Sequence, residues 1–350
     1  MSHWGTPQTG AANVSLPGAV NGQGDPRANF YKVFTGEVLT AFDRKNVMKE
    51  RHRIRNIRNQ KSASFANTGQ ARGRIHVPGT EILGQNMQHN ETIITVDDLL
   101  ISDVFIADLY EAMNHYEVRR DYSHQLGTAL SRTFDKQTMR VAARAAREPN
   151  KITGLPGGTS LFLGGGYGGL SDADKAIAMA DALFNAHQTF LEHDVDPSDC
   201  FAIIRPDTYF RLVRNKDLLN RDYGGLGSYA QADLPMVAGI PLVVSNNLPN
   251  QDDGANTSTE VYVPGNDGVS VVRDGIDYIS TKYADDYTDL EAVIMKPEAI
   301  GTVMLIDLTL QSQYDMRRQG TLMLARMALG HGTLRPECAI EVRASDAPGQ

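Results

Sequence analysis

The chain has 350 residues, of which 41% are hydrophobic and 22% charged, and its 42 acidic and 34 basic residues give a formal net charge of −8. This is the composition of an ordinary globular protein, long enough for one large domain or for two to three smaller ones, each with its own core. The negative charge argues against a surface that binds nucleic acid or anionic lipid throughout, but it leaves room for a local basic patch.

The cysteines and the apolar runs narrow the class of protein further. Cys200 and Cys338 have neither C-x-x-C nor zinc-type spacing, so we expect reduced thiols in a reducing compartment. No apolar run approaches the ~20 residues that span a bilayer. The first residues also lack the basic and apolar regions of a signal peptide. We therefore expect no membrane segment, no signal peptide and no metal site.

The N-terminal part of the chain predicts a tail, an arm and a basic strip. Residues 1–29 are rich in Gly, Pro, Asn, Gln and Ser and predict a disordered or extended tail. Four apolar residues then predict a short helix or a docked arm, and each could equally belong to a local core: Phe34, Val38, Leu39 and Phe42. In the basic stretch 44–61, Arg51, Arg53 and Arg55 share one face if the chain is extended. This strip fits an acidic neighbour or phosphate, and it equally fits a solvated charged strand.

Residues 61–106 predict β structure. The segments 62–66, 70–77, 91–96 and 99–106 are rich in β-branched and apolar residues, and 78–86 supplies turn residues between them. A long hairpin is the economical assignment. Because its first half is too polar for a core strand, we expect the hairpin to project from the body of the protein.

Two helices are predicted in the middle of the chain. Residues 117–147 contain no proline and repeat apolar residues at three- and four-residue steps, which predicts one helix of ~45 Å. With a single apolar stripe, it should run across a domain rather than through its centre. After a glycine-rich loop, Ser171 and Asp174 resemble a capping box. The second amphipathic helix is marked by Ile177, Ala180, Phe184, His187 and Leu191.

The remainder of the chain predicts strands, at about 200–207, 240–246, 261–275, 299–311, 321–329 and 338–343. Helices and strands are thus segregated along the sequence rather than regularly alternating. This order favours the α+β class.

The glycine-rich loop contains Gly164, Gly166 and Gly169, which match the dinucleotide-binding pattern G-x-G-x-x-G. A true site needs a buried strand before the turn and an acidic residue that ends a second strand ~20 residues later. Only the short segment 159–163 precedes Gly164, and Asp207 ends the next predicted strand 38 residues after Gly169. The spacing therefore predicts a simple loop between two helices and no cofactor site.

Other catalytic patterns are missing from the sequence. It contains no G-K-[ST], no G-x-S-x-G and no H-E-x-x-H. His187 and His193 point about 120° apart on a helix, and neighbouring carboxylates such as Asp97 and Asp98 face opposite ways in a strand. We therefore predict no catalytic residue, no cofactor and no enzymatic activity.

Four stretches of sequence share a resemblance to one family. They are KVFTGEVLTAF (32–42), HNETIITVDDLLISDVFIADLYEAMNHYEVR (89–119), YSHQLG (122–127) and MALGHGTLRPE (327–337), with looser similarity at 203–213 and 222–249. In these stretches the chain resembles the major capsid protein of short-tailed phages of the T-seven-like group. Residues 150–175 match no motif of that family, so the glycine-rich loop is expected to be particular to this protein.

The resemblance implies the α+β fold of Hong Kong 97-type capsid proteins. Its parts would be an N-terminal arm (1–60), an extended loop formed by the hairpin (61–95), a discontinuous peripheral domain with a spine helix (96–153 and 296–343), an axial domain (154–295) and a tail (344–350). The implied role is to assemble, in the bacterial cytoplasm, hexamers and pentamers into the icosahedral shell of a virion around double-stranded DNA. Implied partners are a scaffolding protein, a portal protein at one vertex and DNA held by weak non-specific contacts.

One feature of this chain bears on how such a shell is held together. In the type member of the fold, a lysine of the extended loop links adjacent subunits covalently. Here no lysine lies between Lys61 and Lys136. We therefore expect a shell stabilised by non-covalent contacts only, each weak but made many times over.

The expected subunit contacts form three groups. The arm anchors are Phe34, Val38, Leu39 and Phe42; the charge-pairing residues are Arg51, Arg53 and Arg55; and the hairpin residues resting on an adjacent molecule are Phe65, Ile75 and Val77. Two other functions stay open at this point. One is an oxidoreductase that uses the 164–169 turn, and the other is a nucleic-acid-binding module centred on residues 51–58.

Overall fold

The computed structural model describes residues 14–15, 38, 42, 46–71, 73–82, 84–97, 99–108, 118–164, 166–215, 234–253, 271–274 and 277–344. The chain divides into two compact units of three segments each. The first unit comprises Met1–Asn46, Val96–Phe134 and Met304–Leu329, and the second comprises Val47–Thr95, Asp135–Val303 and Gly330–Gln350. Both units combine helix and strand.

The first unit is built on long antiparallel strands. β5 (Leu99–Ala107) pairs with β14 (Gly320–Thr333), and β13 (Ile300–Asp315) lies on the other side of β14, in a sheet of order β1-β5-β14-β13-β2. β1 (Val14–Ser15) runs parallel to β5. The side chains of β5 alternate between exposed and half-buried along most of the strand, as expected for a sheet covered on one face. The last strand in this order is β2 (Arg53–Asn56), whose residues are assigned to the second unit, as are residues 300–303 of β13 and 330–333 of β14.

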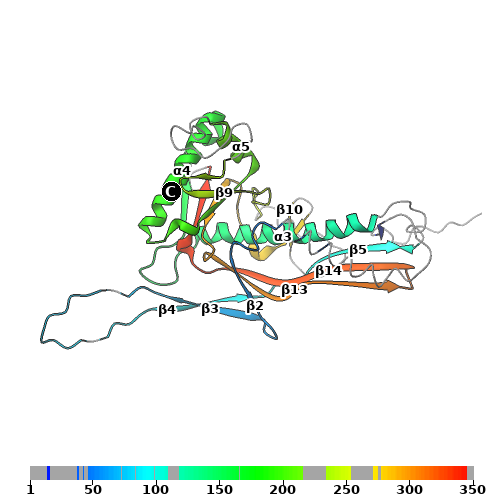
Figure 1. Ribbon diagram of the computed structural model, residues 1–350, viewed down its shortest axis with the longest axis horizontal. Coiled ribbons are helices and arrows are strands. Elements are labelled where there is room, and N and C mark those ends of the chain that lie inside the picture. The colour runs from blue at the N-terminus through cyan, green and yellow to red at the C-terminus, as the bar shows by residue number, and fades with distance from the viewer. Residues whose placement is uncertain are drawn as a thin grey trace, which may run out of the picture. The chain divides into compact units, whose positions relative to one another are not determined.

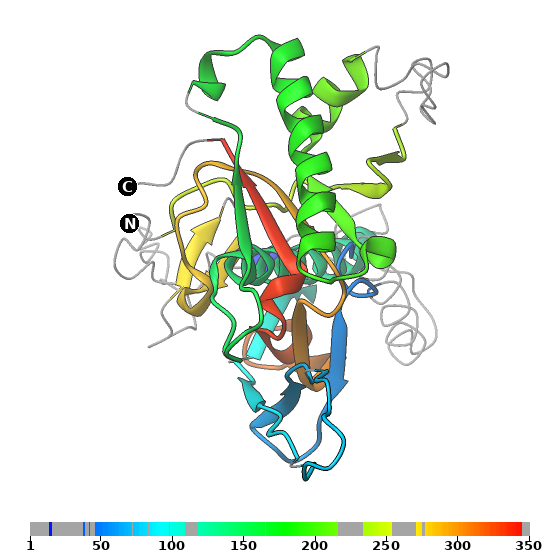
Figure 2. The ribbon, with the colours of Figure 1, turned by 90° about the vertical axis from the view of Figure 1, so that its left-hand side faces the viewer.

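The second unit contains a six-stranded mixed sheet of order β6-β15-β12-β7-β9-β8. Its strands are β6 (Thr159–Phe162), β15 (Ala339–Arg343), β12 (Leu290–Met295), β7 (Phe201–Ile204), β9 (Ile240–Val244) and β8 (Met236–Val237). The central strands β7, β12 and β15 are buried along almost their whole length, which explains why their sequences read as continuous apolar runs. Figure 2 shows β15 in red beside β6, with the green helix α4 standing next to them.

Two small pairings and a short helix complete the second unit. β10 (Val271–Asp274) and β11 (Asp277–Ser280) form an antiparallel pair, as do β3 (Ser62–Thr68) and β4 (His89–Thr95). α5 (Pro206–Arg214) begins with proline at its first position and packs against α4 (Asp172–Glu192). The predicted α+β class is therefore confirmed.

The long predicted helix is present as α3 (Val118–Arg147), but its surroundings differ from the prediction. From Asp135 to Ala146 every side chain except the half-buried Arg144 is buried, polar ones included, so this half of the helix is covered on all sides. The single-stripe interpretation was wrong because it counted only apolar residues as buried.

Ion pairs make this burial possible. Arg140 pairs with Asp253 and Asp274, and Lys136 lies 3.0 Å from Asp277. About two turns nearer the helix end, Arg147 pairs with Glu341 of β15 at 2.9 Å. Each of these three buried or half-buried cations thus meets a carboxylate from a distant part of the second unit, which offsets the cost of removing it from water.

α4 also corrects an expectation about its orientation. Ser171 caps the helix as predicted, since its hydroxyl accepts a hydrogen bond from the Asp174 amide. The residues facing the unit are, however, Ala176, Met179, Ala180, Ala182, Leu183, Ala186 and Phe190. Ile177, Phe184 and Leu191, which marked the helix in the sequence, are about half exposed. The sequence has apolar residues on two faces, and periodicity alone did not separate them.

Candidate subunit interfaces

The β3–β4 hairpin is the most extended feature of the second unit. Its strands pair in register from Ser62↔Thr95 to Thr68↔His89, and the twenty residues between them contain no further strand in the described part (Figure 1). The strand expected at 70–77 is therefore not formed. Gly69 precedes that segment and Gly73 lies within it. The described residues of 81–88, on the other side of the loop, form no strand, so the β-forming residues of 70–77 have no partner to pair with.

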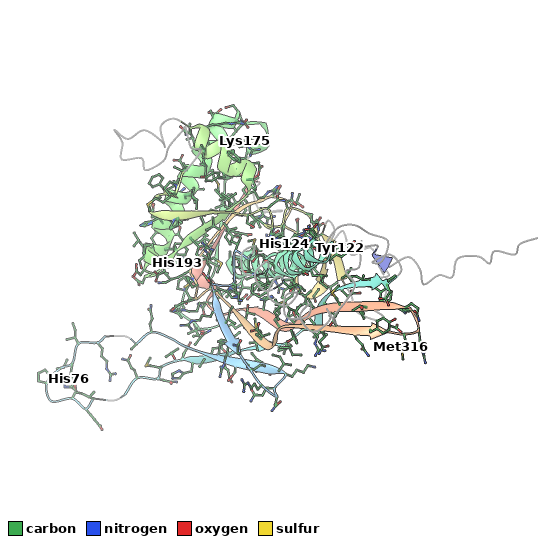
Figure 3. The ribbon with its side chains drawn as sticks, turned by 45° about the vertical axis from the view of Figure 1, so that its right-hand side comes forward. His76, Tyr122, His124, Lys175, His193 and Met316 are labelled. Atoms are coloured by element: carbon green, nitrogen blue, oxygen red, sulfur yellow. The ribbon has the colours of Figure 1, made fainter. Side chains whose placement is uncertain are left out.

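The loop of this hairpin carries apolar side chains into solvent. Ile75 is 98% exposed, and Val77 and Ile82 are 63% and 72% exposed. Figure 3 labels His76, between the first two, at the far end of the loop. A turn is closed by Thr80, whose amide and hydroxyl both donate to the Val77 carbonyl. Two of the predicted hairpin residues, Ile75 and Val77, thus form an apolar tip that its own chain leaves uncovered.

The third predicted hairpin residue lies at the base and meets the basic strip. The guanidinium of Arg55 lies over the ring of Phe65, 5.7 Å from its centroid, and donates to the Ser64 carbonyl at 2.7 Å. Arg53, two residues earlier on β2, pairs with Glu298 at 3.4 Å. These two arginines therefore have partners within their own chain.

Arg51 lies before β2 rather than in it, so the three arginines do not share one strand face. It donates to the Val47 carbonyl at 2.7 Å and lies 5.9 Å from the centroid of the Phe201 ring. All three side chains remain exposed, which leaves their charges accessible to further partners.

The arm residues divide into two that can be placed and two that lie outside the described residues. Val38 and Phe42 are buried, and Phe42 makes an edge-to-face contact with Phe134 of α3, with centroids 6.1 Å apart. Both side chains thus belong to the core of the first unit. Phe34 and Leu39 lie outside the described residues.

The second unit contains a buried histidine pair, which the sequence did not predict. His52 Nδ1 is 2.6 Å from the Met48 carbonyl, and its Nε2 is 2.7 Å from the Thr302 hydroxyl, which is itself 2.7 Å from His331 Nδ1. Because a carbonyl only accepts, His52 carries its proton on Nδ1. Thr302 must then donate to His52 Nε2 and accept from His331 Nδ1.

This arrangement needs the His52 ring to be neutral, because its Nε2 accepts a hydrogen bond, and it needs His331 to carry a proton on Nδ1. Burial lowers the pKa of His52 to about 4 and holds the pKa of His331 well below its ordinary value. No local signal could have found the pair, because the residues lie 250 and 29 positions from Thr302. The role of the pair is structural, because these hydrogen bonds connect three chain segments, at residues 48–52, 302 and 331.

The glycine-rich loop does not have the architecture of a dinucleotide site. A strand, β6, does precede it, contrary to expectation, but β6 is an edge strand and only half-buried. Gly164 and Gly166 have positive φ, of 96° and 98°, and so need glycine for the turn. A Cβ at Gly169 would meet nothing within 4 Å, whereas the third glycine of a dinucleotide turn permits close helix–strand packing.

The described residues also lack a cluster suited to metal binding or to thiol chemistry. They contain no group of three or more His, Cys, Asp or Glu able to hold a metal ion. Cys200 and Cys338 are free and buried, and burial raises their thiol pKa to about 11 and about 12. No described helix is long and apolar enough to cross a bilayer.

Comparison with known proteins gives the family. The model of the Gp10A-like major capsid protein family matches residues 64–343. The major capsid protein of Escherichia phage T7 is 31% identical over 331 residues, which cover 90% of this chain and 92% of that protein. This chain belongs to the Gp10A-like major capsid protein family.

Solved structures of phage capsids agree with this family assignment. The capsid structure of cyanophage P-SCSP1u is similar with a TM-score of 0.71 and 36% identity, over 85% of this chain and 87% of that one. The mature capsid of bacteriophage PhiM1 matches with a TM-score of 0.69 at 15% identity, over 87% and 88% of the two chains. The Hong Kong 97-type fold is therefore confirmed, and the chain is a major capsid protein of a tailed phage that forms the shell of the virion.

Proposed function

We propose that this capsid protein assembles as hexamers and pentamers into an icosahedral shell around double-stranded DNA, held by non-covalent contacts alone. Assembly would take place in the bacterial cytoplasm, with a scaffolding protein, and with a portal protein at one vertex. The division into arm (1–60), extended loop (61–95), peripheral domain (96–153 and 296–343) and axial domain (154–295) belongs to this proposal. So does the absence of any catalytic role.

The exposed tip of the β3–β4 hairpin carries the proposal. Ile75, Val77 and Ile82 are among the most exposed large apolar side chains of the described residues, and they lie in the loop that joins β3 and β4. Exposing such residues in solution is unfavourable, at about 25 cal/mol per Å². A neighbouring subunit that covers the tip recovers this free energy, and no lysine at 62–135 offers a covalent alternative.

The other predicted contacts take narrower roles in this proposal. Val38 and Phe42 would fix the base of the arm to α3, while Phe34 and Leu39 would contact a neighbour. Arg51, Arg53 and Arg55 keep exposed charge for acidic groups of an adjacent copy, in addition to their partners within the chain. Phe65, stacked under Arg55, would set the direction in which the hairpin leaves β2.

The test is assembly of the full chain co-expressed with its cognate scaffolding protein, followed by sedimentation and electron microscopy. The unmodified chain should give closed shells. The double variant Ile75→Ser/Val77→Ser should leave the thermal midpoint of the unassembled protein unchanged and greatly reduce the yield of shells. The control His76→Ser/Glu81→Ser changes two exposed polar residues of the same loop and should assemble normally. Shells at normal yield from the apolar variant would refute the role of the tip.

A further inference from the structure

Helix α4 has an outward apolar face that its own unit leaves uncovered. Leu170, Ile177, Phe184 and Leu191 are 41%, 48%, 56% and 56% exposed and follow one another at seven-residue steps. Seven residues are nearly two helical turns, so the three within α4 lie on one side of the helix, across about 21 Å. We call these four residues the α4 stripe. Figure 3 labels Lys175 near the start of the helix and His193 at its end.

The opposite face of α4 is already fully used. Met179, Leu183 and Phe190 have no exposed surface, and the helix contacts β6 and β8, the two edge strands of the six-stranded sheet. The stripe therefore cannot turn inward without exposing this core. Helices with apolar residues on opposite faces are usually covered on both faces. In α4 the chain itself covers only one of them.

The stripe differs from the scattered apolar residues that every protein exposes. Single apolar side chains on a surface need no explanation, whereas the largest apolar patch of a typical monomer, of about 300–600 Å², is often functional. Side chains of this size, about half uncovered, expose on the order of 100 Å² each, so the stripe amounts to roughly 400 Å². Only Asp181 and Gln188 interrupt it, one between each successive pair of apolar residues on the helix.

We propose that the α4 stripe packs against a second copy of this chain in the assembled shell. The size of the patch favours this occupant. A stable pair of proteins in solution needs about 800 Å² per partner, which the stripe alone does not provide. In a closed shell each copy makes several contacts at once, and multivalency makes a contact of this size sufficient. The stripe is thus as large as the patches that are often functional and too small to hold a pair of free chains.

The contact must join the stripe to a different surface of the neighbour. In a ring of five or six copies, rotation places one patch of each copy against another patch of the next. On the second unit, α5 exposes Phe210 between Asp207 and Arg214, whose side chain is 71% exposed. The Phe210 ring offers an apolar surface to the stripe, and the exposed guanidinium of Arg214, which lies 3.7 Å from Asp172 of its own chain, can also meet an acidic group of the neighbouring copy. The stripe and the face of α5 are therefore the two sides that we infer for the contact.

The experiment compares two substitutions on neighbouring positions of α4. Phe184→Gln removes the largest side chain of the stripe, and Asn185→Gln changes an exposed residue about 100° around the helix. Both replacements suit an exposed helix position, so both variants should unfold at the same temperature as the unmodified protein. With the scaffolding protein present, Phe184→Gln should raise the protein concentration needed for shell formation at least about ten-fold, and Asn185→Gln should not.

A labelling measurement tests the contact without relying on loss of assembly. Cys200 and Cys338 are buried, so Phe184→Cys or Asn185→Cys adds the one reactive thiol among the described residues. The thiol at 184 should react with a small maleimide in unassembled protein and at least ten times more slowly in shells, while that at 185 should change much less. Equal labelling of position 184 in both states, or shells at unchanged concentration from Phe184→Gln, would overturn the inference.

This inference rests on the proposed assembly, and the two can fail separately. If the unmodified chain forms no shells with its scaffolding protein, the proposed function fails. If the unmodified chain forms shells and the variants at 184 behave like those at 185, only the role of the α4 stripe fails.

Discussion

Arg140 donates a hydrogen bond from Nε to the carboxylate of Asp253 at 2.7 Å, and both side chains are completely removed from solvent. The Nη2 atom of the same guanidinium reaches Asp274 at 3.0 Å. The pair joins the buried half of α3 to two segments that lie more than a hundred residues further along the chain. Substituting only one partner of this ion pair is therefore a sensitive test of the core of the second unit.

Asp253→Ala should lower the free energy of unfolding by about 3 kcal/mol, because it leaves a buried guanidinium short of its closest carboxylate. Urea denaturation of the unassembled protein measures this. Glu298→Ala is the matched control. It also removes a carboxylate from arginines, Arg53 and Arg335, but in partly exposed pairs, and should cost less than about 1 kcal/mol. Equal losses from the two variants would contradict the structural role of the buried pair.

The histidine pair predicts a loss of stability in acid. His52 has a pKa of about 4 in the folded chain against 6.5 when exposed, so between these values the unfolded chain binds a proton that the folded chain excludes. Stability is therefore full above pH 6.5 and falls as the pH drops toward 4. His331, whose pKa is also lowered by burial, acts in the same direction.

Asp135 opposes this effect. Burial raises its pKa from 3.8 to about 6, so acidification through this range protonates the folded chain first and favours it. Two histidines outweigh one carboxyl group, and the net loss between pH 7 and pH 5 should be about 2 kcal/mol. In His52→Gln the fall should shrink to less than about 1 kcal/mol, while the exposed-residue control His76→Gln should keep the full fall. A stability independent of pH in the unmodified protein would contradict this network.

Gly158 should not tolerate a side chain. A Cβ there would overlap the backbone of Ala145 and Ala146 near the end of α3, and neither backbone segment can move freely. We expect Gly158→Ala to lower the free energy of unfolding by about 2 kcal/mol or more. Gly168→Ala, in the glycine-rich loop where the added Cβ meets nothing within 4 Å, should change it by less than about 0.5 kcal/mol. Thermal and urea unfolding of the two variants give the comparison.

Shells of this protein should dissociate into single chains without breaking any covalent bond between subunits. The segment 62–135 offers no lysine amine, so the hairpin has no nucleophile of that kind to link to a neighbour. Purified shells boiled in detergent should migrate as one band at the mass of the monomer, 38.3 kDa. A ladder of higher bands that resists reductant would contradict the non-covalent proposal.

The two native thiols should not react with thiol reagents until the chain unfolds. Cys200 and Cys338 are buried, and burial raises the pKa of both, so little thiolate is available at neutral pH. A chromogenic disulfide reagent should titrate no thiol in the native protein and two after denaturation. Rapid reaction of either thiol in the folded protein would show that the second unit opens more readily than its packing indicates.

Several elements could be predicted from the sequence because their signals are local. The Ser171 cap and the end of α3 before Pro149 both depend on residues within one or two turns. The short helix α5, which begins at Pro206, was not predicted, because its first residues were assigned to the preceding strand. The failure of the 164–169 turn as a dinucleotide site was likewise visible in its spacing. The strand expected at 70–77 failed because β structure needs a partner, and the residues opposite it formed none.

The sequence by itself determined the class of fold, the positions of α3, α4 and several strands, the resemblance to a capsid family, and the absence of lysine from residues 62–135. Only the tertiary structure decided which apolar face of α4 points inward, that half of α3 is buried with its charges, and that His52 and His331 meet at Thr302. The reason is physical: periodicity and capping act over a few residues, whereas burial depends on which distant segments supply a covering surface. For Ile177, Phe184 and Leu191 no such segment is found in the described part of the chain. We propose that a neighbouring copy covers them in the assembled shell.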